Sequence, residues 1–342
     1  MPITKAYGCM GLSAFYTSSR ERTEAEKIEV FKAAYDSGCT LFNTATFYGP
    51  LHEEGFGENL RLLNKCLQLV DRSQIQIMCK IGMDTRAPVT APATQWNLSG
   101  KEEALRADVN YALKTLGVDY IDIIVMCRVP SDAPIEDVMK TMVAIVNEGK
   151  AKHIGLSEAS AEIIRRACAV APLYCIEQEY SLWARDIEAE IIPVCRELGV
   201  KIVAYCPLGR GFLTGTIVSR SNNGMDPYDY RMMAQPRFNE ENFAKNLALV
   251  ERLREIATIK GITLSQLSLA WLHSQGSDII PIPGTSSIDH LNENMAAYNV
   301  TLEAHEVLAL NDIFAVDAPA GDRYPTVHLT FRGGGNIGAA AH

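Results

Sequence analysis

Polar residues end most of the short apolar runs in this sequence of 342 residues. These residues come from runs that are far apart along the chain: Asn43, Lys80, Cys127, Ser157, Gln178, Tyr205 and the Gly284-Thr285 pair. In a barrel of parallel strands, the carboxyl ends of the strands form one face, and active sites are built on that face. The scattered residues therefore predict a single polar pocket.

Three of these residues differ in the chemistry that they can perform. Burying a lysine at the end of an apolar strand is costly. We therefore interpret Lys80 as a functional residue and not as an ordinary surface lysine. Asn43 does not titrate and cannot act as a base. Cys127 is either a reactive thiol or a small apolar filler, and the second interpretation is favoured because free cysteines are usually buried and inert.

The elements that must position these residues alternate regularly along the chain. Apolar runs predict strands at residues 5–10, 40–43, 75–80, 120–126, 153–156, 173–178, 201–205 and 278–283. Helical periodicity predicts helices at residues 24–37, 57–69, 102–116, 135–148, 163–167, 188–198, 241–260, 265–274, 288–297 and 303–314. Ser99 and Glu102 have the spacing of a capping box, which predicts that Ser99 begins the third helix.

This order of strands and helices predicts the fold class. Strictly alternating strands and helices imply a parallel sheet with right-handed crossovers. Eight strand–helix units favour closure into an α/β (β/α)₈ TIM barrel with a single domain at residues 1–317. Residues 318–342 are predicted to form a mobile C-terminal tail, because the segment is rich in glycine near its end.

Two stretches, residues 83–98 and 214–238, do not fit the repeat and follow strand ends. Loops of this length in a compact fold tend to be lids or binding loops, so both are predicted to lie over the active face. Their aromatic residues and those beside them favour an apolar carbonyl substrate: Trp96, Phe212, Tyr228 and Tyr230.

Composition excludes several classes of function. The formal net charge of −9 argues against nucleic-acid binding, which depends on basic patches. No apolar run reaches the roughly 18 residues that would span a bilayer, and the amino terminus has no apolar signal core, so no membrane association is expected. The nine cysteines are spread singly without metal-ligand spacing, which predicts reduced thiols, no metal site and a cytoplasmic location.

Five motifs in this sequence resemble those of the aldo-keto reductase superfamily. They occur in the family's order between residues 5 and 314: Gly8-Cys9-Met10-Gly11-Leu12-Ser13, Phe42-Asn43-Thr44-Ala45 with Tyr48-Gly49, Gly155-Leu156-Ser157-Glu158, Ala204-Tyr205-Cys206-Pro207-Leu208-Gly209-Arg210-Gly211, and Pro281-Ile282-Pro283-Gly284-Thr285. The branch that they resemble most is the plant and fungal group described as auxin-induced or pyridoxal-reductase-like proteins.

The resemblance implies an NADPH-dependent reductase with a catalytic tetrad of Asp, Tyr, Lys and His. By position, Tyr48 resembles the general acid and Lys80 the residue that lowers its pKa. The chain departs from the family at the other two positions, where Asn43 replaces the Asp and Cys127 the His. Because an amide cannot hold a lysine by charge, we expect Lys80 to be less firmly held, with a lower pKa than in the family pattern.

These departures predict a slow or narrowed reductase, in which Asn43→Asp with Cys127→His would raise turnover. His52 lies near Tyr48 in the sequence and is a candidate replacement for the missing imidazole, although a solvated loop histidine is the favoured interpretation.

The resemblance also implies a binding path for the cofactor. Ser157, Glu158 and Gln178 would lie at the nicotinamide amide, and Tyr205 would stack on the nicotinamide ring. The remaining predicted contacts are Met10, Gly11, Cys206, Pro207, Leu208, Gly209, Arg210, Gly211, Gly284, Thr285, Ser286, Ser287, His290, Glu293 and Asn294. The glycines of residues 206–211 would allow close approach of a pyrophosphate, and the helix after Ser287 could bind a phosphate at its N-terminus.

The sequence leaves alternatives open for the cofactor preference and for the function. Many relatives have a lysine at position 287 that pairs with the 2′-phosphate of NADP, and this chain has Ser287 instead. His290 and Arg210 are candidates to bind that phosphate in its place. NADP(H) is therefore favoured over NAD(H). A small carbonyl compound is the predicted substrate. The alternatives are a nucleotide-binding regulatory or redox-sensing subunit with little turnover, and an enzyme that performs other chemistry in the same pocket. The sequence does not decide between a monomer and a homo-oligomer.

Overall fold

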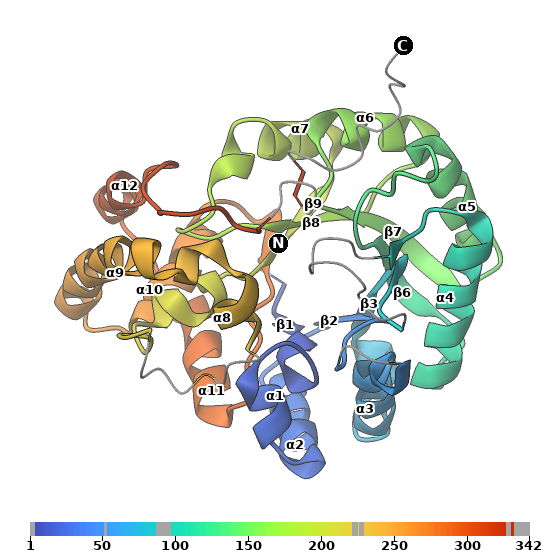
Figure 1. Ribbon diagram of the computed structural model, residues 1–342, viewed down its shortest axis with the longest axis horizontal. Coiled ribbons are helices and arrows are strands. Elements are labelled where there is room, and N and C mark those ends of the chain that lie inside the picture. Colours follow the sequence, from blue (N-terminus) through green and yellow to red (C-terminus); the bar gives the residue numbers. More distant parts are fainter. Residues whose placement is uncertain are drawn as a thin grey trace.

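Eight parallel strands form a barrel in the computed structural model, which describes residues 4–50, 53–86, 97–220, 225, 229–325 and 330–331 (Figure 1). The sheet has the order β1-β2-β3-β6-β7-β8-β9-β10. Its strands are β1 (Ala6–Gly8), β2 (Leu41–Ala45), β3 (Gln76–Ile81), β6 (Ile121–Met126), β7 (Ala151–Ser157), β8 (Cys175–Glu179), β9 (Lys201–Tyr205) and β10 (Ile279–Pro281). The predicted (β/α)₈ barrel is therefore confirmed.

Helices surround the strands (Figure 1). They are α1 (Thr17–Glu21), α2 (Glu24–Asp36), α3 (Glu58–Leu67), α4 (Glu102–Leu116), α5 (Ile135–Asn147), α6 (Ala161–Val170), α7 (Ile191–Leu198), α8 (Tyr230–Ala234), α9 (Glu240–Lys260), α10 (Leu264–Ser274), α11 (Ile288–Ala296) and α12 (Ala304–Ile313). The two stretches expected to be loops contain short elements: β4 (Met83–Asp84) pairs antiparallel with β5 (Asn97–Leu98), and α8 lies in the second stretch.

The predicted capping box at the start of α4 is wrong. Lys101 is the N-cap, and no side chain caps that helix end. The Ser99 hydroxyl instead donates to Asp132 Oδ2 at 2.7 Å, and the Gly100 amide donates to Asp132 Oδ1 at 2.8 Å. A carboxylate from the following strand–helix loop thus competes successfully for the serine, because a charged acceptor makes the stronger hydrogen bond.

The barrel closes where its first strand meets the chain beyond its last strand. The Gly8 amide donates to the Pro283 carbonyl at 3.2 Å. A Cβ atom on Gly284 would lie 2.6 Å from the Gly8 carbonyl oxygen, so the two backbones approach as closely as only glycine permits. Closure brings the Gly284-Thr285 pair beside the ends of β1 and β2, as the pocket prediction requires.

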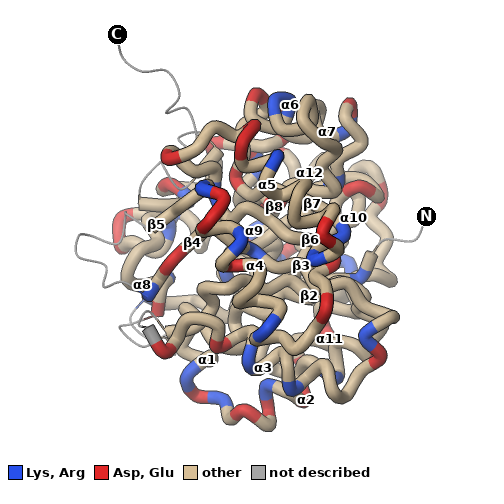
Figure 2. The backbone as a smooth tube through the Cα atoms, turned by 90° about the vertical axis from the view of Figure 1, so that its right-hand side faces the viewer, with Lys and Arg blue, Asp and Glu red and all other residues tan. Residues whose placement is uncertain are grey.

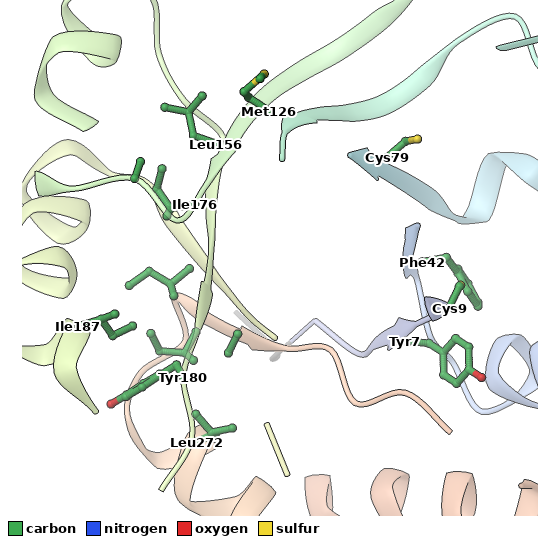
Figure 3. Close-up of a cluster of buried hydrophobic side chains, with 14 of the residues drawn as sticks. Tyr7, Cys9, Phe42, Cys79, Met126, Leu156, Ile176, Tyr180, Ile187 and Leu272 are labelled. Carbon is green, nitrogen blue, oxygen red and sulfur yellow. The ribbon is translucent and has the colours of Figure 1, made fainter. Parts of the chain in front are cut away.

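Side chains alternate between the two faces of each strand, and this alternation separates two cores. Figure 3 shows Phe42, Cys79, Met126, Leu156 and Ile176 on the helix side of their strands, in the larger hydrophobic cluster. A second cluster fills the barrel, and it includes Leu41, Met78, Ile123, Cys175 and Val203. Two residues further along, the same inward face presents polar side chains on β2, β3, β8 and β9: Asn43, Lys80, Glu177 and Tyr205.

The outer surface carries charges of both signs, and Figure 2 shows Lys and Arg interspersed with Asp and Glu. In the part of the chain that the structure describes, no helix is long and apolar enough to cross a membrane. No group of His, Cys, Asp and Glu residues suited to a metal ion occurs among the described residues.

The chain after α12 returns to the barrel (Figure 1). Arg323 and Tyr324, from the segment predicted to be a mobile tail, are buried there, with Arg323 only 6% exposed. Residues 326–329 and 332–342 lie outside the described residues, as do Trp96 and Tyr228 of the predicted lids and His52.

Candidate active site

A lysine, an amide and a carboxylate meet inside the barrel. Lys80 Nζ donates to Asn43 Oδ1 at 2.7 Å and lies 3.0 Å from Glu177 Oε1 and 3.2 Å from Oε2. Asn43 Nδ2 donates to Glu177 Oε2 at 2.8 Å. The three side chains come from β2, β3 and β8, and they are 2–3% exposed. They therefore form a closed hydrogen-bonded triad around a buried ammonium group.

Sequence reasoning missed Glu177, which is next to the predicted site residue Gln178. Side chains alternate along β8, so only one of the two neighbours can face the barrel interior. Glu177 lines the central cavity and Gln178 does not. The Gln178 amide instead donates to the Ala159 carbonyl at 2.9 Å. A glutamate inside a buried strand is itself a signal, because an unpaired buried carboxylate is costly.

Lys80 was expected to be less firmly held, with a lower pKa than in the family pattern, because Asn43 carries no charge; that expectation left out Glu177. Burial by itself lowers the pKa of Lys80, but the Glu177 carboxylate reverses this effect and raises the pKa above its ordinary value. The physical reason is that a carboxylate 3.0 Å away stabilises the ammonium form. Lys80 is therefore charged across the physiological pH range.

Tyr48 lies above this triad, and its ring centroid is 4.9 Å from Lys80 Nζ. Burial raises the pKa of the Tyr48 phenol, and the Lys80 charge lowers it in part. The phenol is consequently protonated at neutral pH and can act as a proton donor. Its ring packs in a cluster with Phe47, Met83 and Cys127, and Tyr48 also lines the central cavity.

The turn that carries Tyr48 is fixed by an asparagine from α3. Asn59 Nδ2 donates to the Cys9 carbonyl and to Ser13 Oγ, its Oδ1 accepts from the Thr44 hydroxyl at 2.6 Å, and its backbone amide donates to the Tyr48 carbonyl at 3.0 Å. Sequence reasoning did not single out Asn59. These contacts orient the Tyr48 backbone relative to β2, because a fully bonded buried amide has one favourable position.

Cys127 behaves as a filler. The thiol is 1% exposed, and burial raises its pKa, so it is not a reactive thiolate. The neighbouring Arg128 donates to the Cys127 carbonyl at 2.6 Å and, at 3.4 Å, to Ser157 Oγ. Arg128 also donates to Cys127 Sγ at 3.8 Å, and a thiol is a weaker hydrogen-bond donor than an imidazole.

A cavity of about 520 Å³ opens above the triad. It is lined by all four predicted catalytic positions, Asn43, Tyr48, Lys80 and Cys127. Most of the predicted cofactor residues also line it, namely Met10, Gly11, Tyr205, Cys206, Pro207, Leu208, Arg210, Gly211, Gly284, Thr285, Ser286, Ser287, His290, Glu293 and Asn294. Ser157, Glu158, Gln178 and Gly209 do not line it.

Strained backbone concentrates around this cavity. Among the described residues, the non-glycine residues with positive φ are Phe15, Glu158, Cys206 and Arg210. Cys206, Arg210 and the nearby Gly209 and Gly211 place four left-handed residues in one loop after β9. Such runs form concave backbone surfaces that suit anions, and strain of this kind is typical of functional sites.

The N-terminus of α11 faces the same cavity. Ser287 is its N-cap and accepts from the His290 amide at 3.4 Å. The Tyr7 hydroxyl donates to the Thr285 carbonyl, which fixes the approach to the helix. Ser286, Ser287 and His290 all line the cavity, so the partial positive charge of the helix end points toward it.

The C-terminal segment covers the predicted nicotinamide side of the site, which sequence reasoning did not foresee. Arg323 forms a two-pronged ion pair with Glu158, at 3.0 and 3.1 Å. Burial by itself raises the pKa of Glu158, but Arg323 and its other partners hold it at about 2. The Tyr205 hydroxyl donates to Glu158 at 2.8 Å and lies 3.0 Å from the Tyr324 hydroxyl. Tyr324 also accepts from Arg210, at 3.1 Å.

Comparisons with known proteins agree with this geometry. The sequence profile described as the aldo/keto reductase family matches residues 9–314. The chain belongs to the aldo-keto reductase family. It is 39% identical over 318 residues to a probable aldo-keto reductase 1 of Glycine max, covering 93% of this chain and 87% of that protein.

Solved structures of aldo-keto reductases have the same fold. The glycerol dehydrogenase AKR11B4 from Gluconobacter oxydans superposes with a TM-score of 0.78 at 23% identity, covering 95% of each chain. The thermostable aldo-keto reductase Tm1743, in complex with the inhibitor epalrestat, gives 0.67 at 25% identity, covering 90% of this chain and 94% of that one. As a member of this oxidoreductase family, the protein carries its polar cluster at the carboxyl ends of the strands, where barrel enzymes carry their active sites.

Proposed function

We propose that this aldo-keto reductase reduces the carbonyl group of a small organic aldehyde or ketone with NADPH. The observation that carries the proposal is the buried Lys80 ammonium, paired with Glu177 and placed 4.9 Å from the ring centroid of Tyr48. A permanent positive charge beside a buried phenol has little structural value, because burying it is costly. It is the arrangement that proton donation to a developing oxyanion requires.

The lining of the cavity fits a dinucleotide. The left-handed loop from Cys206 to Gly211 and the N-terminus of α11 are two anion-binding surfaces on the same cavity, as a pyrophosphate and a further phosphate would need. Tyr205 lines the same cavity and would face the nicotinamide ring. When bound, the nicotinamide supplies the hydride. We propose NADPH in preference to NADH because His290 lies at the N-terminus of α11, where it can contact a 2′-phosphate.

The residues of the chain then perform the acid step. The Tyr48 hydroxyl donates its proton to the carbonyl oxygen as negative charge develops there. Lys80 stabilises the resulting phenolate by charge. Cys127 lines the cavity beside Tyr48 but is only a weak hydrogen-bond donor. The cavity walls contributed by Phe15, Phe47 and Tyr230 suit an apolar carbonyl compound. The nine free thiols support a cytoplasmic location, where reducing conditions preserve them.

The test is oxidation of NADPH with a reactive aromatic aldehyde, measured for the native protein and for Tyr48→Phe, with Phe56→Leu as a control in the same cluster but away from the cavity lining. We expect Tyr48→Phe to lower kcat by about 10²–10³-fold, and to leave NADPH binding measured by fluorescence unchanged. Equal turnover of Tyr48→Phe and the native protein would contradict the role of Tyr48.

A second function is favoured by one observation. Arg323 pairs with the buried Glu158, and neither Ser157 nor Gln178, the other two predicted nicotinamide contacts, lines the cavity. A nucleotide-binding sensor with little turnover would suit such a closed nicotinamide side. It predicts tight NADPH binding together with no turnover by the native protein on any carbonyl compound tested.

A further inference from the structure

The carboxylate beside Lys80 comes from an unexpected strand. Glu177 follows Asn43 by 134 residues and Lys80 by 97, and it contacts both. The titratable groups that interact with Lys80 are the phenol of Tyr48, the thiol of Cys127 and three further thiols, in addition to Glu177. Burial raises the pKa of Tyr48, Cys127, Cys9, Cys79 and Cys175, so these groups are neutral. Within the described residues, Glu177 is thus the anion that balances the Lys80 charge.

The orientation of Asn43 shows that the amide and the carboxylate depend on each other. The Asn43 amide nitrogen donates to Glu177, while its oxygen accepts from Lys80. An ionised carboxylate at position 43 could accept from Lys80 but could not donate to Glu177. The Asn43 amide can therefore bridge the ammonium and the carboxylate, whereas two ionised carboxylates at positions 43 and 177 could not hydrogen-bond to each other.

We infer that Glu177 is a positioning residue of the reaction, which supplies from β8 the negative charge that keeps Lys80 protonated and directed at Tyr48, while Asn43 links the two. This inference rests on the proposed reductase function. In the family pattern, an Asp at position 43 carries the negative charge. In this protein Glu177, across the barrel, carries it instead. The position lost from the tetrad is therefore compensated, and the substitution at position 43 is no sign of an inactive site.

The first experiment removes the charge and keeps the shape with Glu177→Gln. A buried lysine without a counter-ion loses its proton more easily, so the alkaline limb of the kcat profile is expected to move to lower pH. We expect kcat at pH 7 to fall by about 10²-fold, because the tyrosine loses the charge that stabilises its phenolate. NADPH binding, followed by fluorescence, should stay within a few-fold of the native value.

The decisive experiment exchanges the two groups in the double variant Glu177→Gln/Asn43→Asp. A carboxylate at position 43 lies at the site of an oxygen that is 2.7 Å from Lys80 Nζ, and the amide at position 177 can donate to it. We expect this variant to recover most of the lost kcat and the native alkaline limb. A structural role alone would not make the second substitution restore the pH profile of the first.

Two outcomes overturn the inference. One is a Glu177→Gln protein with native kcat and a native pH profile, while Tyr48→Phe is inactive; the proposed function then stands and the role of Glu177 falls. The other is a double variant that folds without recovering activity, or that does not fold, since the inference holds the two arrangements to be equivalent. If Glu177→Gln does not fold by itself, the double variant still decides. If Tyr48→Phe retains native turnover, the proposed function fails instead.

Discussion

Restoring the family's carboxylate at position 43 is expected to harm this protein. In Asn43→Asp alone, the new oxygen replaces a nitrogen that lies 2.8 Å from Glu177 Oε2. At an effective dielectric constant of about 20, two charges at this separation repel by about 6 kcal/mol. The attraction to Lys80, at 2.7 Å, has about the same size and offsets the repulsion. What remains is the cost of burying one more ion, which amounts to several kcal/mol.

The protein can avoid this cost by taking up a proton. Glu177 then raises the pKa of the introduced carboxyl group above its unfolded value of about 3.9. A raised folded-state pKa means that the stability of the variant is fully present below the unfolded pKa and is lost as the pH rises through the folded pKa. Relative to the native protein, the free energy of unfolding of Asn43→Asp should fall by up to about 1.4 kcal/mol per pH unit.

Urea unfolding of both proteins between pH 5 and pH 9 measures this difference. We expect a deficit of up to about 1.5 kcal/mol at pH 5, a growing deficit toward pH 9, and a kcat that is at best equal to the native value. A variant that is more stable than the native protein at every pH, and also faster, would refute the reasoning. It would show that the residue at position 43, and not Glu177, determines how well the Lys80 charge is stabilised, as the sequence alone suggested.

Three further predictions concern the surroundings of the site. Cys127→His forces a larger ring into a packed cluster, so the free energy of unfolding should fall by about 1–3 kcal/mol in urea titrations; an unchanged midpoint would mean that the position is roomy. Arg323→Met leaves Glu158 as a buried charge without its main partner, which should cost about 3–5 kcal/mol at pH 7. Because the folded pKa of Glu158 is depressed to about 2, this contribution is present above pH ~4.3 and is lost in acid, so the two proteins should converge as the pH falls toward 2. Gly284→Ala brings a methyl group within 2.6 Å of a backbone oxygen and should lower the thermal midpoint, whereas the control Gly11→Ala, whose nearest atom is 3.5 Å away, should not.

The sequence by itself determined the barrel and the two central groups of the site. Apolar runs and helical patterns are local, and eight repeats of them leave few arrangements other than a closed parallel barrel. Tyr48 and Lys80 were predicted from their resemblance to the family's motifs, and each lies at or just after the end of a strand, where strand ends share one face of the barrel. The cavity confirms that these ends converge.

Only the tertiary structure decided how the charge of Lys80 is balanced and what covers the site. Which of Glu177 and Gln178 faces inward depends on the pleat of β8, and a shift of one residue reverses it. Arg323 and Glu158 are 165 residues apart in the sequence, and no periodic pattern predicts their contact. Electrostatic pairs of this kind depend on distances in space, and those distances exist only once the strands have closed into a barrel.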